Sequence, residues 1–192
     1  IFILIALYLA EKKGTISQKL HRNLLRELDA IPTKVEQTLK LDAQSRYIAS
    51  VYKDVPNCLF LGRGINFPVA LEGALKLKEI SYKHAEGYPA AEMKHVPIAL
   101  IDAEMPTVVI AIKTDHYEKV VSNIQEIKAR EGKIIAIVNN GDSVVSKIAD
   151  HVIEIPEVDE RLSPLLTTIP LQLISYHIAV MRGCHVDQPR NL

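Results

Sequence analysis

Three ionisable side chains within residues 70–81 have the spacing of a single helical face. Glu72, Lys76 and Glu79 occupy positions i, i+4 and i+7, and such positions lie on the same side of an α-helix. A carboxylate beside an ammonium group near the ligand-binding end of a sheet could move a proton between carbons adjacent to a carbonyl group. An exposed stripe of ion pairs with no chemical role would give the same pattern.

Polar residues are also dense between His84 and Pro97. This stretch holds two histidines, two glutamates and two prolines, with His95 near its end. It is too irregular for a simple helix, so we expect a shaped loop of the kind that often holds catalytic groups. A metal site is unfavourable because His84 and His95 are too far apart for a helical pair and no third ligand is evident.

The elements that must position these residues alternate between short strands and longer helices. Strands are predicted at 58–61, 107–112, 134–138 and 151–156, and helices at 68–83, 116–131 and 162–182. This alternation is typical of an α/β fold, a three-layer αβα sandwich with a mostly parallel sheet. In such sheets ligands lie outside the carboxyl ends of the strands, so the turns 62–68 and 139–142 are candidate rims.

The segment before the first strand is predicted to be helical. Apolar residues recur every three or four positions from Ser17 to Leu41, which indicates a helix interrupted near Pro32, and a further helix is expected at 45–52. The apolar run in residues 1–13 is about half as long as the ~20 residues of a membrane-spanning helix. We expect it to be the tail of a buried helix whose packing partner lies upstream in a longer protein.

The composition argues against some classes of binding partner. Among the 192 residues, 23 are basic and 23 acidic, and no run of like charge stands out, so neither nucleic acid nor a membrane surface is an expected partner. Cys58 and Cys184 lack metal-binding spacing and are interpreted as buried, reduced thiols, which fits a cytoplasmic protein. No cofactor or metal is expected.

The order of motifs resembles the glucosamine-6-phosphate synthases, the family of isomerising glutamine–fructose-6-phosphate transaminases. The resemblance rests on the run Leu71-Glu-Gly-Ala-Leu-Lys-Leu-Lys-Glu-Ile-Ser-Tyr82, then Glu92-Met-Lys-His95, and finally Asp187-Gln-Pro-Arg-Asn-Leu192. It covers nearly the whole chain. It implies a second SIS (sugar isomerase) domain of flavodoxin-like nucleotide-binding type at 46–186, preceded at 1–45 by the end of a first SIS domain and a linker, and followed at 187–192 by the start of a tail.

The resemblance also implies roles for individual residues. Glu79 matches the glutamate that moves the proton between C1 and C2 of fructose 6-phosphate, and Lys76 and Glu72 match its charged neighbours. His95 matches a histidine associated with ring opening, which reaches the active site of the partner subunit in a homodimer. A histidine can supply the proton that the ring oxygen gains, because it titrates near neutral pH.

Departures from the family pattern limit what this chain is expected to do alone. Val96 stands where the family commonly has glycine, the family's Schiff-base lysine would follow Leu192, and the turn 62–67 has no hydroxyl for a phosphate group. The glutaminase and first SIS domains are also missing. We therefore expect a fragment that is inactive alone and does not bind phosphate tightly.

Two other functions remain open at this stage. A non-catalytic SIS module could bind a phosphosugar as a regulatory ligand, although it would need Ser/Thr-rich turns. An SIS-type deglycase or isomerase could act on a different sugar phosphate, but the tail Asp187-Gln-Pro-Arg-Asn argues against it.

Overall fold

The computed structural model describes residues 1–95 and 97–190. Within them, one sheet contains five parallel strands in the order β2-β1-β3-β4-β5. The strands are β1 (Asn57–Gly62), β2 (His84–Pro89), β3 (Pro106–Ile110), β4 (Lys133–Asn139) and β5 (His151–Ile155). The α-helices are α1 (Phe2–Lys12), α2 (Gln18–Leu39), α3 (Asp42–Tyr52), α4 (Phe67–Ser81), α5 (Tyr117–Lys128) and α6 (Pro164–Met181).

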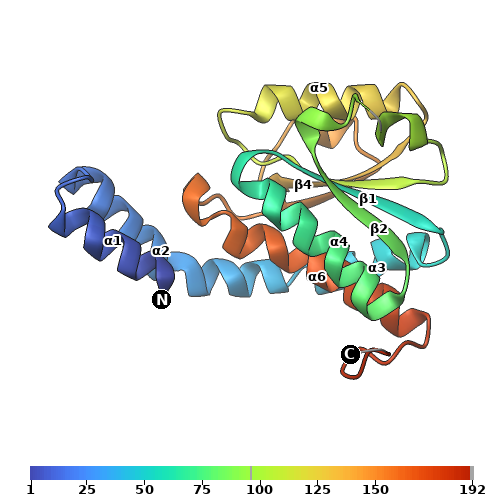
Figure 1. Ribbon diagram of the computed structural model, residues 1–192, viewed down its shortest axis with the longest axis horizontal. Helices are drawn as coiled ribbons and strands as arrows, with labels where there is room; N and C mark the ends of the chain where they lie inside the picture. Colours follow the sequence, from blue (N-terminus) through green and yellow to red (C-terminus); the bar gives the residue numbers. More distant parts are fainter. Residues whose placement is uncertain (96, 191–192) are drawn as a thin grey trace.

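Helices cover both faces of the sheet. Figure 1 shows α5 on one face and α3, α4 and α6 on the other. The two faces carry separate hydrophobic cores, because successive strand residues point to opposite sides. Phe60 and Ile135 face the layer of α3, α4 and α6, whereas Leu61 and Ala136 face α5. The predicted three-layer αβα sandwich is confirmed.

Helix α4 lies very close to the sheet and to α6. A Cβ atom on Gly73 would stand 2.8 Å from Leu171 Cδ1 and 2.9 Å from Phe60 Cδ1, and one on Gly87 of β2 would stand 2.9 Å from Leu71 Cα. Only glycine, which has no Cβ atom, fits at both positions without a shift of the neighbouring atoms. This packing fixes which side of α4 faces outward.

The strand β2 corrects the sequence interpretation of residues 84–97. The stretch begins with a six-residue parallel strand, in register with β1 from Asn57↔His84 to Gly62↔Pro89, and only then becomes irregular. β2 is the edge strand of the sheet. An edge strand tolerates glycine, proline and charged residues because only one side must join the hydrogen-bonded ladder.

Helices α1 and α2 form a hairpin that projects from the sandwich (Figure 1). The predicted interruption at Pro32 is wrong, since α2 runs unbroken from Gln18 to Leu39. Proline costs about 3 kcal/mol inside a helix, but α2 is supported on both sides of it. Ser17 Oγ caps the first turn by accepting from the N–H of Leu20 at 3.2 Å, and Thr38 is fully buried.

Two apolar helices differ sharply in their surroundings. α1 is helical as expected, but Leu7 is its only buried residue, and Phe2 is 88% exposed. α6 is long and apolar enough to cross a membrane by composition, yet half of it is buried, and it packs against α3 and α4. The apolar character of α6 is therefore explained by its place in the core.

Candidate functional site

The three charged residues singled out on α4 form one ion-pair network. Lys76 Nζ donates to Glu79 Oε2 at 2.7 Å and lies 3.8 Å from Glu72 Oε1. The hydrogen bond to Glu79 raises the pKa of Lys76, with burial opposing the shift. An ammonium that stays charged across the physiological range thus fixes the orientation of the Glu79 carboxylate.

This network lies on a face of α4 that is neither buried nor fully solvated. The side chains of Glu72, Lys76 and Glu79 are 36%, 33% and 27% exposed. Leu71 and Leu75 lie beside them and are also exposed, at 44% and 49%. Charged groups that could do acid–base chemistry therefore lie beside two leucines that no described residue buries.

The structure corrects where this face sits relative to the sheet. α4 begins just after the carboxyl end of β1 and runs back toward the amino ends of the strands, where β2 begins at His84. Glu79 is 12 residues beyond Phe67, which is roughly 18 Å along a helix rising 1.5 Å per residue. The predicted position near the ligand-binding end of the sheet is wrong for Glu79.

His95 lies at the opposite end of the strands from Glu79. It occupies a turn after the carboxyl end of β2, with its side chain 74% exposed and its Nε2 3.6 Å from Glu92 Oε2. The length of β2 separates this turn from the end of α4 that carries Glu79. One copy of the chain therefore does not bring Glu79 and His95 together. Val96, whose effect on this turn was in question, lies outside the described residues.

The buried Asn66 of the turn 62–68 serves the fold itself. A Cβ on Gly62 would stand 2.1 Å from the Asn66 backbone oxygen, so the turn closes tightly on itself. Asn66 is only 3% exposed, and its Oδ1 accepts from Thr167 Oγ1 at 3.0 Å. This bond ties the start of α4 to the start of α6.

The turn 139–142 is likewise held by internal bonds. Asn139 Oδ1 accepts from the N–H of Lys113 at 2.7 Å, and Asp142 Oδ1 accepts from the N–H of Val145 at 2.8 Å. The hydroxyl of Tyr117 donates to the other oxygen of Asp142. These acceptors are already occupied, so this candidate rim offers little to a ligand.

Both cysteines are free thiols, and they differ in burial. Cys58 is buried, which raises its pKa to about 12. Cys184 is only half-buried, so the prediction of two buried thiols is correct for Cys58 alone. Within residues 1–95 and 97–190, no three His, Cys, Asp or Glu side chains approach closely enough to hold a metal ion.

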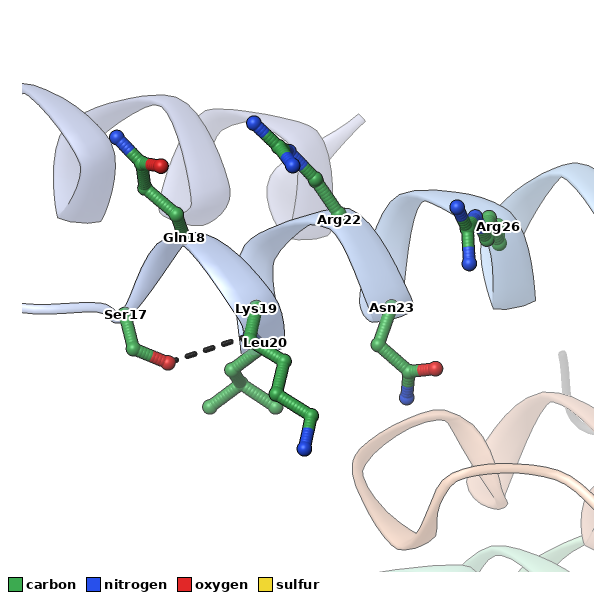
Figure 2. A pocket seen from close by; sticks show the side chains of 7 residues that line it. All are labelled: Ser17, Gln18, Lys19, Leu20, Arg22, Asn23 and Arg26. Atoms are coloured by element: carbon green, nitrogen blue, oxygen red, sulfur yellow. Dashed lines mark hydrogen bonds between the residues drawn. The ribbon is translucent and has the colours of Figure 1, made fainter.

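A hollow of about 820 Å³ lies away from α4, at the start of α2. Figure 2 shows its lining residues, with Arg22 and Asn23 pointing in different directions and the Ser17 cap at one end. All of the lining belongs to one turn and one helix. Nothing there converges on a point where a ligand atom could sit.

Residues 52–182 match the SIS domain family. The chain belongs to this family. The C-terminal domain of glucosamine-fructose-6-phosphate aminotransferase from Francisella tularensis shares the fold with a TM-score of 0.91 and 39% identity, over 97% of this chain and 52% of that one. Residues 52–182 therefore form an SIS domain. The ion pairs of Lys76 lie on the outward face of its helix α4.

Two curated relatives of this chain carry the name "glutamine--fructose-6-phosphate aminotransferase [isomerizing]". The protein of that name from Bacteroides thetaiotaomicron is 61% identical over 192 residues, which is the whole of this chain and 31% of that protein. The one from Chlorobaculum tepidum is 55% identical over 193 residues, again the whole chain and 31% of its length. The chain therefore spans about a third of these relatives.

Two features of the structure have no local signal in the sequence. Tyr82 ends α4 with a left-handed φ of 59°, and its hydroxyl accepts from the N–H of Arg190 at 2.8 Å, while the Arg190 guanidinium lies 4.1 Å from the ring centre. Separately, Arg63, Lys94 and Lys119 line one small cavity. Their wide separation in the sequence gives no signal, because only the fold brings them together.

Proposed function

We propose that this chain is the second SIS domain of an isomerising glutamine–fructose-6-phosphate aminotransferase. The identity of 61% over the whole chain supports this proposal. In it, residues 46–186 form the domain, residues 1–45 lead from a first SIS domain, and residues 187–192 begin a tail. The full reaction, fructose 6-phosphate and glutamine-derived ammonia to glucosamine 6-phosphate, belongs to the longer protein.

Glu79 is the proposed proton carrier. Converting a 2-keto sugar into a 2-amino aldose requires a proton to leave C1 and a proton to arrive at C2, and one carboxylate can do both in turn. The 2.7 Å bond from Lys76 holds that carboxylate in one orientation, with Glu72 as a second, weaker partner of the ammonium. This geometry is the observation that carries the proposal.

His95 is proposed to act in the active site of a partner subunit. It lies at the carboxyl end of β2, whereas Glu79 lies toward the amino end, and the His95 side chain is 74% exposed. An exposed imidazole can reach across an interface and give a proton to the ring oxygen as the sugar opens. A homodimer would then hold two active sites, each with Glu79 from one chain and His95 from the other.

The proposed partners and compartment are consistent with the charge balance and the free thiols. Equal numbers of acidic and basic residues give no electrostatic reason to expect nucleic acid or an anionic membrane as a partner. The proposed partners are a sugar-phosphate substrate and other domains of the same enzyme. Two free thiols fit the reducing cytoplasm. The proposed compartment is therefore cytoplasmic.

The test is the substitution Glu79→Gln in the full-length enzyme. An amide keeps the shape of the side chain but cannot accept the sugar proton, so glucosamine 6-phosphate formation should fall about 10²- to 10⁴-fold. Glutamine hydrolysis should be retained. Glu118→Gln, on the exposed first turn of α5, is the matched control and should change neither activity. Equal loss of both activities in Glu79→Gln would refute the assigned role.

A further inference from the structure

Tyr82 lies at the end of α4 and continues the face of the helix that carries Glu79. Leu75, Glu79 and Tyr82 occupy positions i, i+4 and i+7, which fall on one side of a helix. Glu79 and Tyr82 are separated by roughly 4.5 Å along the helix axis, at 1.5 Å per residue. Whatever Tyr82 holds in place is therefore a close neighbour of the Glu79 carboxylate.

The backbone of Tyr82 has a conformation that tyrosine rarely adopts. Its φ of 59° and ψ of 24° are left-handed, and its N–H donates to the Lys78 carbonyl oxygen at 3.1 Å, which closes the last turn of α4. Glycine or asparagine usually ends a helix in this way, because bulkier side chains are disfavoured there. Glycine would serve the fold at this position, so the tyrosine side chain needs a separate explanation.

The hydroxyl and the ring of that side chain both contact Arg190. The Tyr82 hydroxyl accepts from the backbone N–H of Arg190 at 2.8 Å. The guanidinium carbon of Arg190 lies 4.1 Å from the ring centre, within the ~6 Å over which a cation is attracted to the face of an aromatic ring. One side chain thus holds the backbone and the side chain of Arg190 at the same time.

These contacts close a loop at the end of α4. The segment 184–190 follows α6, and at its start the Cys184 thiol lies 3.9 Å from the carbonyl oxygen of Ser81. At its other end the segment returns to Tyr82 through Arg190, and Figure 1 shows this last part of the chain beside the end of α4. Most of the residues between the two contacts are exposed. Tyr82 therefore fixes the far end of the loop.

We propose that Tyr82 is a positioning residue for the proton transfer at Glu79, and that it acts by holding Arg190 as one wall of the space beside this carboxylate. Lys76 holds the same carboxylate from the amino-terminal side. A wall that is fixed before the substrate arrives lowers the cost of ordering the reaction centre. The permanently charged guanidinium also favours an anionic sugar phosphate nearby. This inference rests on the proposed function, because it requires Glu79 to carry the proton.

The experiment is the substitution Tyr82→Gly in the full-length enzyme. Glycine suits the left-handed backbone and removes both contacts with Arg190, so stability and activity should respond differently. The kcat for glucosamine 6-phosphate formation should fall roughly 10- to 10²-fold, as expected when a catalytic group and its substrate lose their alignment. Neither glutamine hydrolysis nor the thermal unfolding midpoint should fall. Unchanged kcat, or a loss of kcat accompanied by a lower midpoint, would overturn the positioning role.

Further variants test whether Tyr82 acts through Arg190. Tyr82→Phe keeps the ring beside the guanidinium and should retain most of the kcat that Tyr82→Gly loses. Arg190→Met combined with Tyr82→Gly should be no slower than Tyr82→Gly alone, because both changes remove the same contact. Losses that multiply in the double variant would contradict this route. Tyr176→Leu, exposed on α6, is the matched control and should keep both activities.

Comparison with Glu79→Gln separates a failure of this inference from a failure of the proposed function. If Glu79→Gln abolishes glucosamine 6-phosphate formation and Tyr82→Gly leaves it intact, only the positioning role is wrong. If Glu79→Gln keeps full activity, the role of Glu79 is wrong, and the positioning role fails with it. Loss of activity in both variants, with recovery in Tyr82→Phe, is the result that both proposals predict.

Discussion

Lys76 and Glu79 lie one helical turn apart and share a 2.7 Å hydrogen bond on the outward face of α4. Lys78, two residues from Lys76, is exposed on the same helix, and its side chain forms no hydrogen bond or ion pair among the described residues. The helix therefore provides the lysine of the ion-pair network and, on a different face, a comparison lysine outside it.

Lys76→Met in the full-length enzyme should lower glucosamine 6-phosphate formation while leaving glutamine hydrolysis intact. The reason is that Glu79 loses the donor that orients its carboxylate, and misorientation of a catalytic group costs about 10²-fold. Lys78→Met is the control and should keep full activity. Full activity in Lys76→Met would show that the ion pair is only a surface contact.

Stability should fall below neutral pH through His151. This imidazole packs edge-on against Tyr52 with ring centres 5.4 Å apart, and burial lowers its pKa below the ordinary 6.5, although Asp150 opposes the shift. A lowered folded-state pKa means that the unfolded chain binds the proton more readily. Stability is therefore full above pH 6.5 and is lost as pH falls through 6.5 toward the folded-state pKa.

Urea unfolding at pH 5.5 and 7.5 measures this effect. His151→Phe should reduce the difference in unfolding free energy between the two values, because phenylalanine keeps the ring and removes the proton site. His185→Gln, exposed in the segment after α6, should leave the difference as it is. An unchanged difference in His151→Phe would assign the acid sensitivity to other groups.

The sandwich was predictable from sequence because its inner strands are runs of apolar residues. Residues 134–138 of β4 are all buried, and the alternation of such runs with helices leaves few other folds. β2 was missed because His84-Ala-Glu-Gly-Tyr-Pro89 contains glycine, proline and a glutamate. Its strand conformation comes from pairing with β1, which no local pattern records.

The site was predictable only as far as one helix extends. The spacing of Glu72, Lys76 and Glu79 gave their common face, because helical periodicity is local. The end of the strands near which Glu79 lies follows from the direction of α4 relative to β1, which is a tertiary relation. The pairing of Tyr82 with Arg190 spans 108 residues and left no trace in the sequence.

Gly73→Ala should destabilise the domain even though alanine favours helices by about 1 kcal/mol over glycine. The added Cβ would meet Leu171 Cδ1 at 2.8 Å and Phe60 Cδ1 at 2.9 Å, and overpacking of this kind costs about 1–3 kcal/mol. Thermal unfolding should show a lower midpoint. Lys78→Ala, exposed on the same helix, should shift it little, and a raised midpoint in Gly73→Ala would mean that α4 can move away from α6.

The tail contact at Tyr82 can be tested without reference to activity. Tyr82→Leu removes both the hydroxyl that accepts from Arg190 N–H and the ring beneath its guanidinium. Hydrogen exchange in residues 184–190 should become faster. Tyr176→Leu, exposed on α6, is the control and should leave this segment unchanged. Unchanged exchange in Tyr82→Leu would show that the segment is held by its other contacts.

Mixing two inactive variants decides whether Glu79 and His95 act in the same chain. If each active site takes Glu79 from one subunit and His95 from its partner, a heterodimer of Glu79→Gln and His95→Gln subunits contains one site with both native residues. Random reassociation of equal amounts should then restore roughly a quarter of native activity, since half of the dimers are mixed and each has one intact site. If both residues act within one chain, every site stays defective and no activity returns. The placement of the two residues at opposite ends of β2 in a single domain favours recovery. Native enzyme dissociated and reassociated in the same way controls for losses.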